Sequence, residues 1–245
     1  MTKRARPTYA EVDLGAIAHN VRVVRDRIAP AEVIAVVKAD GYGHGAVEVA
    51  QAALGAGASS LAVALVEEGE ELRAAGVSAP ILLMAEPPPE AADRVVACDL
   101  VPALYTRRFA AALRAEADRR DAPVTVHVKA DTGMARVGVP RDSWDAILDD
   151  LGEMKAELDI GAFWTHFACA DERGHASVRD QLDAFGAFLD RARAHGITAP
   201  RVHVGNSAAA LTLDPEELGG AVRLGIAMYG IPPSPALAGA ADLRP

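Results

Sequence analysis

The chain has 245 residues, of which 51% are hydrophobic and 24% are charged, a composition typical of a folded protein rather than a disordered one. Its net charge of -9, with no basic stripe to offset it, argues against a nucleic-acid partner. No apolar segment of the kind found in secretory signals follows the basic N-terminus, and no apolar run is long enough to span a bilayer, so we expect a cytoplasmic protein.

The first predicted element is a helix that follows Asp13, a residue well suited to cap it. Apolar residues recur behind Asp13 at steps of three and four, which makes one apolar helix face, and Pro30 ends the helix. After this helix, short apolar runs alternate with amphipathic segments. The eight runs, which we expect to be strands, lie at 32–38, 59–65, 80–85, 100–104, 123–129, 157–166, 201–205 and 221–225.

The segments between the runs have helical periodicity, and those at 66–76 and 177–196 each end in a glycine that can cap a helix. Nearly continuous apolar strands that alternate with helices indicate parallel pairing, with both faces of the sheet covered. Eight such units predict an α/β fold, a (β/α)8 TIM barrel of eight parallel strands with an extra N-terminal helix. A doubly wound open sheet is the competing fold, but it usually carries a GxGxxG turn that this chain lacks.

We expect the barrel domain to occupy 1–230. The segment 231–245 is rich in proline and alanine and has no apolar period, which is typical of a linker.

A TIM barrel builds its active site at the carboxyl ends of its strands, and Lys38 ends the first strand behind five apolar residues. Its amine either extends from the strand end into solvent or is partly desolvated and therefore more nucleophilic. The second arrangement suits a Schiff base, formed with the carbonyl group of a substrate or of pyridoxal phosphate.

Phosphate groups commonly bind to barrels at the loops after the seventh and eighth strands. Asn206 and Ser207 follow the predicted seventh strand, and Gly225 and Ile226 follow the eighth. Each pair alone is equally typical of a helix cap or a turn. Together with Lys38, however, they indicate a phosphorylated aldehyde cofactor.

Four further side chains lie at strand ends or in the loops that follow them. Arg223 lies on the eighth strand, and a guanidinium that points into the barrel requires a partner there, either a pyridine nitrogen or a carboxylate. His166, at the end of the sixth strand, is a candidate core histidine, metal ligand or neighbour of a cofactor ring. Lys129 and Arg136 belong to the loop after the fifth strand, where Arg136 is placed to bind a substrate carboxylate through two hydrogen bonds.

Six stretches of the chain resemble, in the same order, the signature stretches of alanine racemases. They are AEVDLGAIAHNV, VVKADGYGHG, HVKADTGMARVG, THFACAD, HVGNSAA and VRLGIAMYG. The resemblance covers essentially the whole chain, and VVKADGYGHG is highly specific to the family. It implies a barrel domain that carries pyridoxal 5'-phosphate on Lys38, and an isomerase that interconverts L-alanine and D-alanine to supply D-alanine for peptidoglycan.

The resemblance also implies a role for each site residue. Lys38 is matched to the catalytic base that handles the α-proton of the D-enantiomer, and Arg136 to the residue that binds the substrate carboxylate. Lys129 matches a position that is carbamylated in many members of the family. The residues that would hold the cofactor, besides Lys38, are Tyr42, His166, Asn206, Ser207, Arg223, Gly225 and Ile226.

The family's second base is a tyrosine of a C-terminal β-rich domain, delivered into the active site of the partner subunit of a homodimer. This chain ends at Pro245, where the linker into such a domain would begin. The resemblance therefore leads us to expect a barrel domain that binds the cofactor but racemises alanine poorly by itself.

Two other functions are compatible with parts of the sequence. A single-domain pyridoxal-phosphate-binding protein of cofactor homeostasis fits the length, but it needs no arginine for a substrate carboxylate. A metal-dependent barrel hydrolase would use His127, His166, His203 and a carbamylated Lys129. It would also need an HxH pair after the first strand, which the chain lacks, and the two cysteines form no CxxC spacing, so we expect no metal.

Overall fold

Asp13 begins the fold as predicted, in a computed structural model that describes residues 10–245. Its carboxylate accepts hydrogen bonds from the backbone N–H groups of Gly15 (2.8 Å) and Ala16 (3.2 Å), which caps helix α1 (Leu14–Ile28). The predicted apolar face of α1 is buried except at Leu14, which is exposed. The basic N-terminal residues lie outside the described part of the chain.

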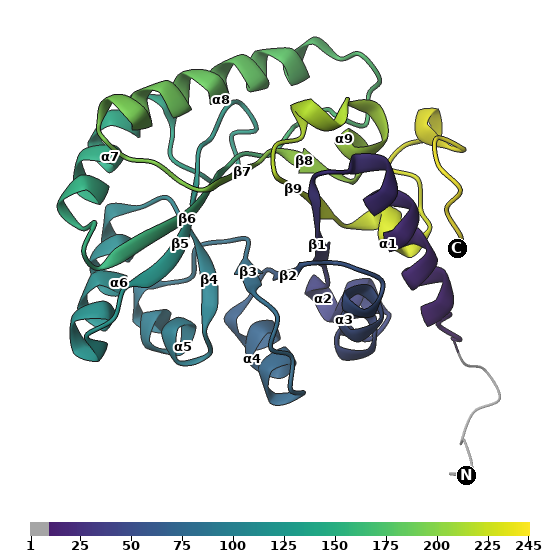
Figure 1. The fold of residues 1–245 in the computed structure, drawn as a ribbon, viewed down its shortest axis with the longest axis horizontal. Helices are drawn as coiled ribbons and strands as arrows, with labels where there is room; N and C mark the ends of the chain where they lie inside the picture. The colour runs from purple at the N-terminus through teal and green to yellow at the C-terminus, as the bar shows by residue number, and fades with distance from the viewer. Residues whose placement is uncertain (1–9) are drawn as a thin grey trace.

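The strands form one parallel sheet that curls into a nearly closed barrel, in the order β7-β6-β5-β4-β3-β2-β1-β9-β8 (Figure 1). Each predicted apolar run contains a strand, so the barrel architecture is confirmed. The strands are β1 (Glu32–Val36), β2 (Ser60–Val63), β3 (Ile81–Leu83), β4 (Leu100–Leu104), β5 (Val124–Lys129), β6 (Leu158–Trp164), β7 (Arg201–His203), β8 (Gly205–Asn206) and β9 (Ala221–Leu224).

The predicted seventh strand is the one that differs, because it is divided in two at Val204. On one side of the division His203 of β7 pairs with β6, and on the other Gly205 of β8 pairs with β9. Val204 itself donates its N–H to the carbonyl of Leu218 at 3.3 Å, outside both ladders. One short chain segment therefore forms both ends of the sheet and brings them together.

The helices cover the outside of the barrel (Figure 1). Beyond α1 they are α2 (Lys38–Gly43), α3 (Ala46–Gly55), α4 (Val66–Ala74), α5 (Ala92–Ala97), α6 (Arg107–Arg120), α7 (Trp144–Glu153), α8 (Ala176–Ala194) and α9 (Ser207–Thr212), with 3-10 turns η1 (Pro89–Ala91), η2 (Arg141–Ser143), η3 (Pro215–Glu217), η4 (Ile226–Tyr229) and η5 (Pro235–Leu237). Gly76 and Gly196 follow α4 and α8 with φ of 83° and 70°, which confirms the predicted glycine caps. No helix in the described part combines the length and apolar character needed to cross a membrane.

Two apolar clusters stabilise this arrangement. The larger one packs the helices against the outer faces of the strands. The smaller one fills part of the barrel interior and consists of Ile34, Val36, Ala62, Leu82 and Ala221. The interior also holds the buried polar side chains of Lys129, His203 and Arg223, which burial makes costly unless they are well paired.

The C-terminal segment 231–245 lies beside α1, as the yellow and purple ribbons of Figure 1 show. Asn20 of α1 donates to the carbonyl of Arg244 at 2.8 Å and accepts from the N–H of Arg244 at 2.7 Å. Leu237 is buried in the larger cluster. The division into a barrel domain at 1–230 and a linker at 231–245 stays a prediction.

Candidate active site

Lys38 stands directly after β1, where the backbone enters a left-handed turn. Ala39, Asp40, Gly41 and Tyr42 have φ of 52°, 51°, 59° and 55°. Such a conformation costs roughly 1–2 kcal/mol for each non-glycine residue, because Cβ crowds the following carbonyl oxygen. Backbone strain of this kind is concentrated at functional sites, where the surrounding structure holds it in place.

Hydrogen bonds from three directions hold this turn. The N–H of Gly41 donates to the carbonyl of Val37 at 2.9 Å, and the carboxylate of Asp40 accepts from Ala46 at 2.8 Å. The N–H of Ala39 donates to the carboxylate of Glu68, on α4, at 2.6 Å. The residues that follow Lys38 are therefore fixed to Val37, α3 and α4, while the Lys38 side chain is half-buried.

Tyr42, Ser207 and Gly225 come together beside this turn. A Cβ atom at Gly225 would lie 2.9 Å from the Tyr42 hydroxyl and 3.9 Å from the Ser207 hydroxyl, so glycine leaves the space between them open. The Ser207 oxygen accepts from the N–H groups of Gly225 (2.9 Å) and Ala227 (3.4 Å). Its own O–H therefore remains a donor, and two hydroxyl groups face a space that suits a phosphate.

The neighbouring residues support this part of the site. Asn206 caps α9, since its side-chain oxygen accepts from Ala209 at 2.9 Å, and Ile226 begins η4 directly after Gly225. The Tyr42 ring packs against Tyr229, with ring centroids 4.7 Å apart. Burial raises the pKa of the Tyr42 hydroxyl, so it is a donor at neutral pH.

Arg223 is buried on the side of the site opposite the hydroxyl groups of Tyr42 and Ser207. Its two terminal nitrogens donate to the carbonyls of Thr165 (2.7 Å), His203 (3.0 Å) and Val204 (3.1 Å). Its Nε atom is buried and has no hydrogen-bond partner among the described residues. An unpaired buried N–H group costs folding free energy. The Nε–H group is therefore well suited to donate to an acceptor from outside the chain.

His203 and His127 form a chain of hydrogen bonds that begins at Arg223 and runs through the barrel interior. An Arg223 terminal nitrogen lies 2.6 Å from Nδ1 of His203, and because arginine only donates, this Nδ1 must accept. His203 is therefore protonated on Nε2, which donates to Nδ1 of His127 at 3.2 Å. His127 in turn carries its proton on Nε2. Burial, followed by the nearby arginines, lowers the pKa of His127 to about 4, so the imidazole is neutral.

Lys129 is almost completely buried at the end of β5, where its amine donates to the carbonyl of Val137. Burial, followed by the charge of Arg223, lowers its pKa to about 8. The Arg136 charge also acts on Lys129, and Arg136 itself is exposed on the loop after β5. His166 lies 3.3 Å from Arg223 through its Nδ1, and burial with the surrounding charges lowers its pKa well below the usual value.

The predicted site residues thus gather at one end of the barrel. Four cations act on His166, in decreasing order Arg223, Arg136, Lys129 and Lys38. Such a site favours an anion such as a phosphate or a carboxylate. The residues also fit pyridoxal phosphate, because the hydroxyl groups at Gly225 suit its phosphate and the unpartnered Nε of Arg223 suits a ring nitrogen.

Two residues of this site carry contacts that the sequence analysis did not predict. Glu68 holds the turn after Lys38, and the only signal for it was its place in the first turn of a predicted helix. His203 was considered only as a metal ligand, whereas its Nδ1 accepts from Arg223. The available signal was its position in the predicted seventh strand. It lies two residues before Gly205 and therefore on the same face of that strand.

Three comparisons with known proteins agree with one another. The family model described as "Alanine racemase, N-terminal domain" matches residues 12–233. The chain is 39% identical over 241 residues to an alanine racemase of Desulfovibrio desulfuricans, covering 98% of this chain and 64% of that protein. It is 43% identical over 243 residues to an alanine racemase of Symbiobacterium thermophilum, covering 98% of this chain and 63% of that protein.

The structural comparison reaches the same group of proteins. The alanine racemase from a D-cycloserine-producing Streptomyces lavendulae superposes with a TM-score of 0.91 at 39% sequence identity, covering 96% of this chain and 62% of that one. The chain therefore spans less than two thirds of the length of the relatives it matches.

Proposed function

This chain belongs to the alanine racemase family, and from that premise we propose that it binds pyridoxal 5'-phosphate on Lys38 and takes part in the interconversion of L-alanine and D-alanine. The named activity of the relatives supports the reaction. The residues at the barrel end support the cofactor. A binding protein without racemase chemistry is not favoured, because the matched relatives are named alanine racemases.

The buried Nε atom of Arg223 is the observation that carries this proposal. It is unpartnered among residues 10–245, although the rest of the guanidinium is saturated. A ring nitrogen placed above it would accept that hydrogen bond. Because arginine stays charged, the ring nitrogen would remain an unprotonated acceptor.

The phosphate would bind on the side of the site opposite Arg223. The Tyr42 and Ser207 hydroxyl groups donate, and the backbone of Gly225 and Ile226 allows a close approach. Asn206 keeps Ser207 in place by capping α9. His166, held neutral by its environment, would pack beside the ring without adding a positive charge.

When bound, pyridoxal phosphate acidifies the α-carbon of an amino acid by delocalising the negative charge left when the proton departs. With pyridoxal phosphate holding the amino group of the substrate, the Nζ atom of Lys38 would be available as a base. It would accept the α-proton of D-alanine at Nζ, and return a proton to the same face in the reverse direction.

Arg136 would bind the substrate carboxylate, because an exposed guanidinium at the mouth of the barrel can donate two parallel hydrogen bonds. Lys129 would orient Arg136 after carbamylation. Its lowered pKa favours that modification, since only a neutral amine reacts with carbon dioxide. A homodimer and a cytoplasmic location stay predictions.

Borohydride reduction of the pyridoxal-phosphate-loaded protein, followed by peptide mapping, tests the cofactor assignment. We expect a pyridoxyl adduct on Lys38, its loss in Lys38→Arg, and its retention in Lys129→Met. An adduct on any other lysine would contradict the proposal.

Exchange of the α-proton with solvent deuterium tests the reaction. With the loaded 245-residue chain we expect exchange from D-alanine that depends on Lys38. Absence of exchange from both alanine enantiomers, with the cofactor bound to Lys38, would favour the binding protein instead.

A further inference from the structure

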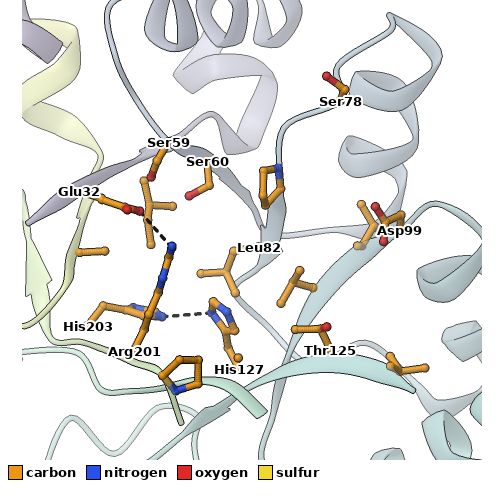
Figure 2. A pocket seen from close by; sticks show the side chains of 18 of the residues that line it. Glu32, Ser59, Ser60, Ser78, Leu82, Asp99, Thr125, His127, Arg201 and His203 are labelled. Carbon is orange, nitrogen blue, oxygen red and sulfur yellow. Dashed lines mark hydrogen bonds and ion pairs between the residues drawn. The ribbon is translucent and has the colours of Figure 1, made fainter. Parts of the chain in front are cut away.

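A cavity of about 600 Å³ lies at the amino-terminal mouth of the barrel (Figure 2). Its wall contains the first residues of six strands, namely Glu32, Ser60, Leu100, Val124, Arg201 and Ala221. The site around Lys38 lies at the carboxyl ends of the same strands. The cavity is therefore separate from the active site and faces the other end of the barrel.

Small residues keep this end of the barrel hollow. Ser60, Gly161 and Ala221, which have small side chains or none, are among the residues that line the cavity. A Cβ atom on Gly161 would lie 2.9 Å from the Thr125 side chain and 3.2 Å from Nε2 of His127.

The cavity contains one oriented hydrogen-bond donor. The contacts of Arg223 and His203 fix the proton of His127 on Nε2, and His127 lines the cavity. Among the described residues this Nε2–H has no acceptor. Figure 2 shows the His127 ring at the cavity wall, with its other nitrogen bonded to His203.

The rest of the wall combines apolar side chains with the hydroxyl groups of Ser59, Ser60, Ser78 and Thr125, and Asp99 on the wall lies 4.0 Å from Arg73. Ile34, Leu82 and Ala221 belong to the apolar cluster inside the barrel and reach the cavity. The one arginine on the wall, Arg201, is 3.0 Å from the carboxylate of Glu32, so its charge already has a partner. An uncharged molecule is therefore favoured over an ion.

We propose that this cavity is a second ligand-binding site, for an uncharged small molecule that accepts a hydrogen bond from Nε2 of His127. The volume, and a wall that combines apolar side chains with directed polar groups, are typical of small-molecule sites. The site is independent of pyridoxal phosphate, and its ligand contacts the far end of the hydrogen-bonded chain that holds Arg223.

Acetophenone and α-methylstyrene test this assignment as matched probes. They share one shape, but a CH2 group replaces the carbonyl oxygen in α-methylstyrene. In protein with 15N-labelled histidine and no added pyridoxal phosphate, acetophenone should shift the Nε2 resonance of His127, assigned by its loss in His127→Phe. We expect acetophenone to bind roughly fivefold more tightly than α-methylstyrene, the equivalent of one neutral hydrogen bond.

Variants locate the binding. Ala221→Leu fills the cavity and should abolish acetophenone binding, while Ala187→Leu, on the exposed face of α8, should leave it unchanged. If Ala221→Leu does not fold, the His127 resonance of the unsubstituted protein still shows whether acetophenone binds in the cavity. No shift of that resonance up to the solubility limit, or equal binding of the two probes, would overturn the proposal. Because the probes bind without the cofactor, failure here is distinct from failure of the proposed function.

Discussion

The backbone N–H of Ala39 donates to one carboxylate oxygen of Glu68 at 2.6 Å. The other oxygen of Glu68 accepts from the N–H groups of Ala64 (2.7 Å) and Leu65 (3.0 Å), which follow β2. One side chain on α4 therefore connects the turn after Lys38 to the loop after the next strand. Such charge-assisted bonds are stronger than neutral ones, so Glu68 is well suited to fix the position of Lys38.

Glu68→Gln should weaken both the fold and the cofactor site, because an amide keeps only one acceptor oxygen. We expect the free energy of unfolding to fall by about 1–3 kcal/mol and the affinity for pyridoxal phosphate to fall roughly tenfold. Urea denaturation and absorbance titration measure the two effects. Glu67→Gln is the matched control, since the neighbouring carboxylate is exposed and pairs with Arg94. Equal effects of the two substitutions would rule out a positioning role.

Arg223→Lys should lower the cofactor affinity at least tenfold and shift the absorbance of the bound cofactor. A single ammonium cannot reach the carbonyls of Thr165, His203 and Val204 together and still present a donor beyond them. Arg201→Lys, at the other end of the barrel, is the control. An unchanged cofactor spectrum in Arg223→Lys would remove Arg223 from the ring-nitrogen role.

The sequence predicted the barrel and the gathering of the site residues for one physical reason. Parallel strands place their carboxyl ends at one edge, so Lys38, Lys129 and Arg223 had to lie at the same end once the strands were recognised. Apolar runs and glycine caps are local signals, and they located the strands and helices to within a few residues.

The contacts that were not predicted depend on distant parts of the chain. Glu68 binds Ala39 across 29 positions, and nothing in the sequence around either residue specifies that pairing. The division of the predicted seventh strand at Val204 follows from the need to pair with β6 on one side and β9 on the other. Only the closed barrel imposes that requirement.

Lys129 should give the folding stability a distinct pH dependence. Its pKa is lowered from the ordinary 10.5 to about 8, so between these values the unfolded chain holds a proton that the folded chain has lost. Stability should therefore rise as the pH increases from 8 to about 10.5, by up to about 3 kcal/mol, in buffer free of carbon dioxide. Lys129→Met should lack this rise. Parallel curves for the two proteins would contradict the assignment.

The same pKa predicts modification of Lys129 near neutral pH. About a tenth of its amine is neutral at pH 7, against roughly one part in three thousand for an ordinary lysine. Mass spectrometry of trapped carbamate with added bicarbonate should therefore find the adduct on Lys129 before it appears on the exposed Lys155.

Protonation of His127 should destabilise the fold in acid. The pKa of His127 falls from 6.5 to about 4 on folding, so the unfolded chain takes up the proton first as the pH falls. Stability supplied by the neutral imidazole is present above pH 6.5 and is lost between pH 6.5 and 4, by up to about 3 kcal/mol. A proton on Nδ1 would face the N–H of His203 and break the contacts that continue to Arg223.

His127→Phe, which cannot be protonated, should make this part of the stability curve less steep, as urea denaturation at successive pH values would measure. Part of the slope remains, because burial also lowers the pKa of His166 and His203. His175→Asn removes an exposed histidine at the N-cap of α8 and substitutes another good cap, so its curve should follow that of the unsubstituted protein. A slope between pH 6.5 and 4 that is as steep in His127→Phe as in the unsubstituted protein would assign the acid sensitivity to other groups. The tautomer assigned to His127, and with it the donor in the cavity, would then lose its support.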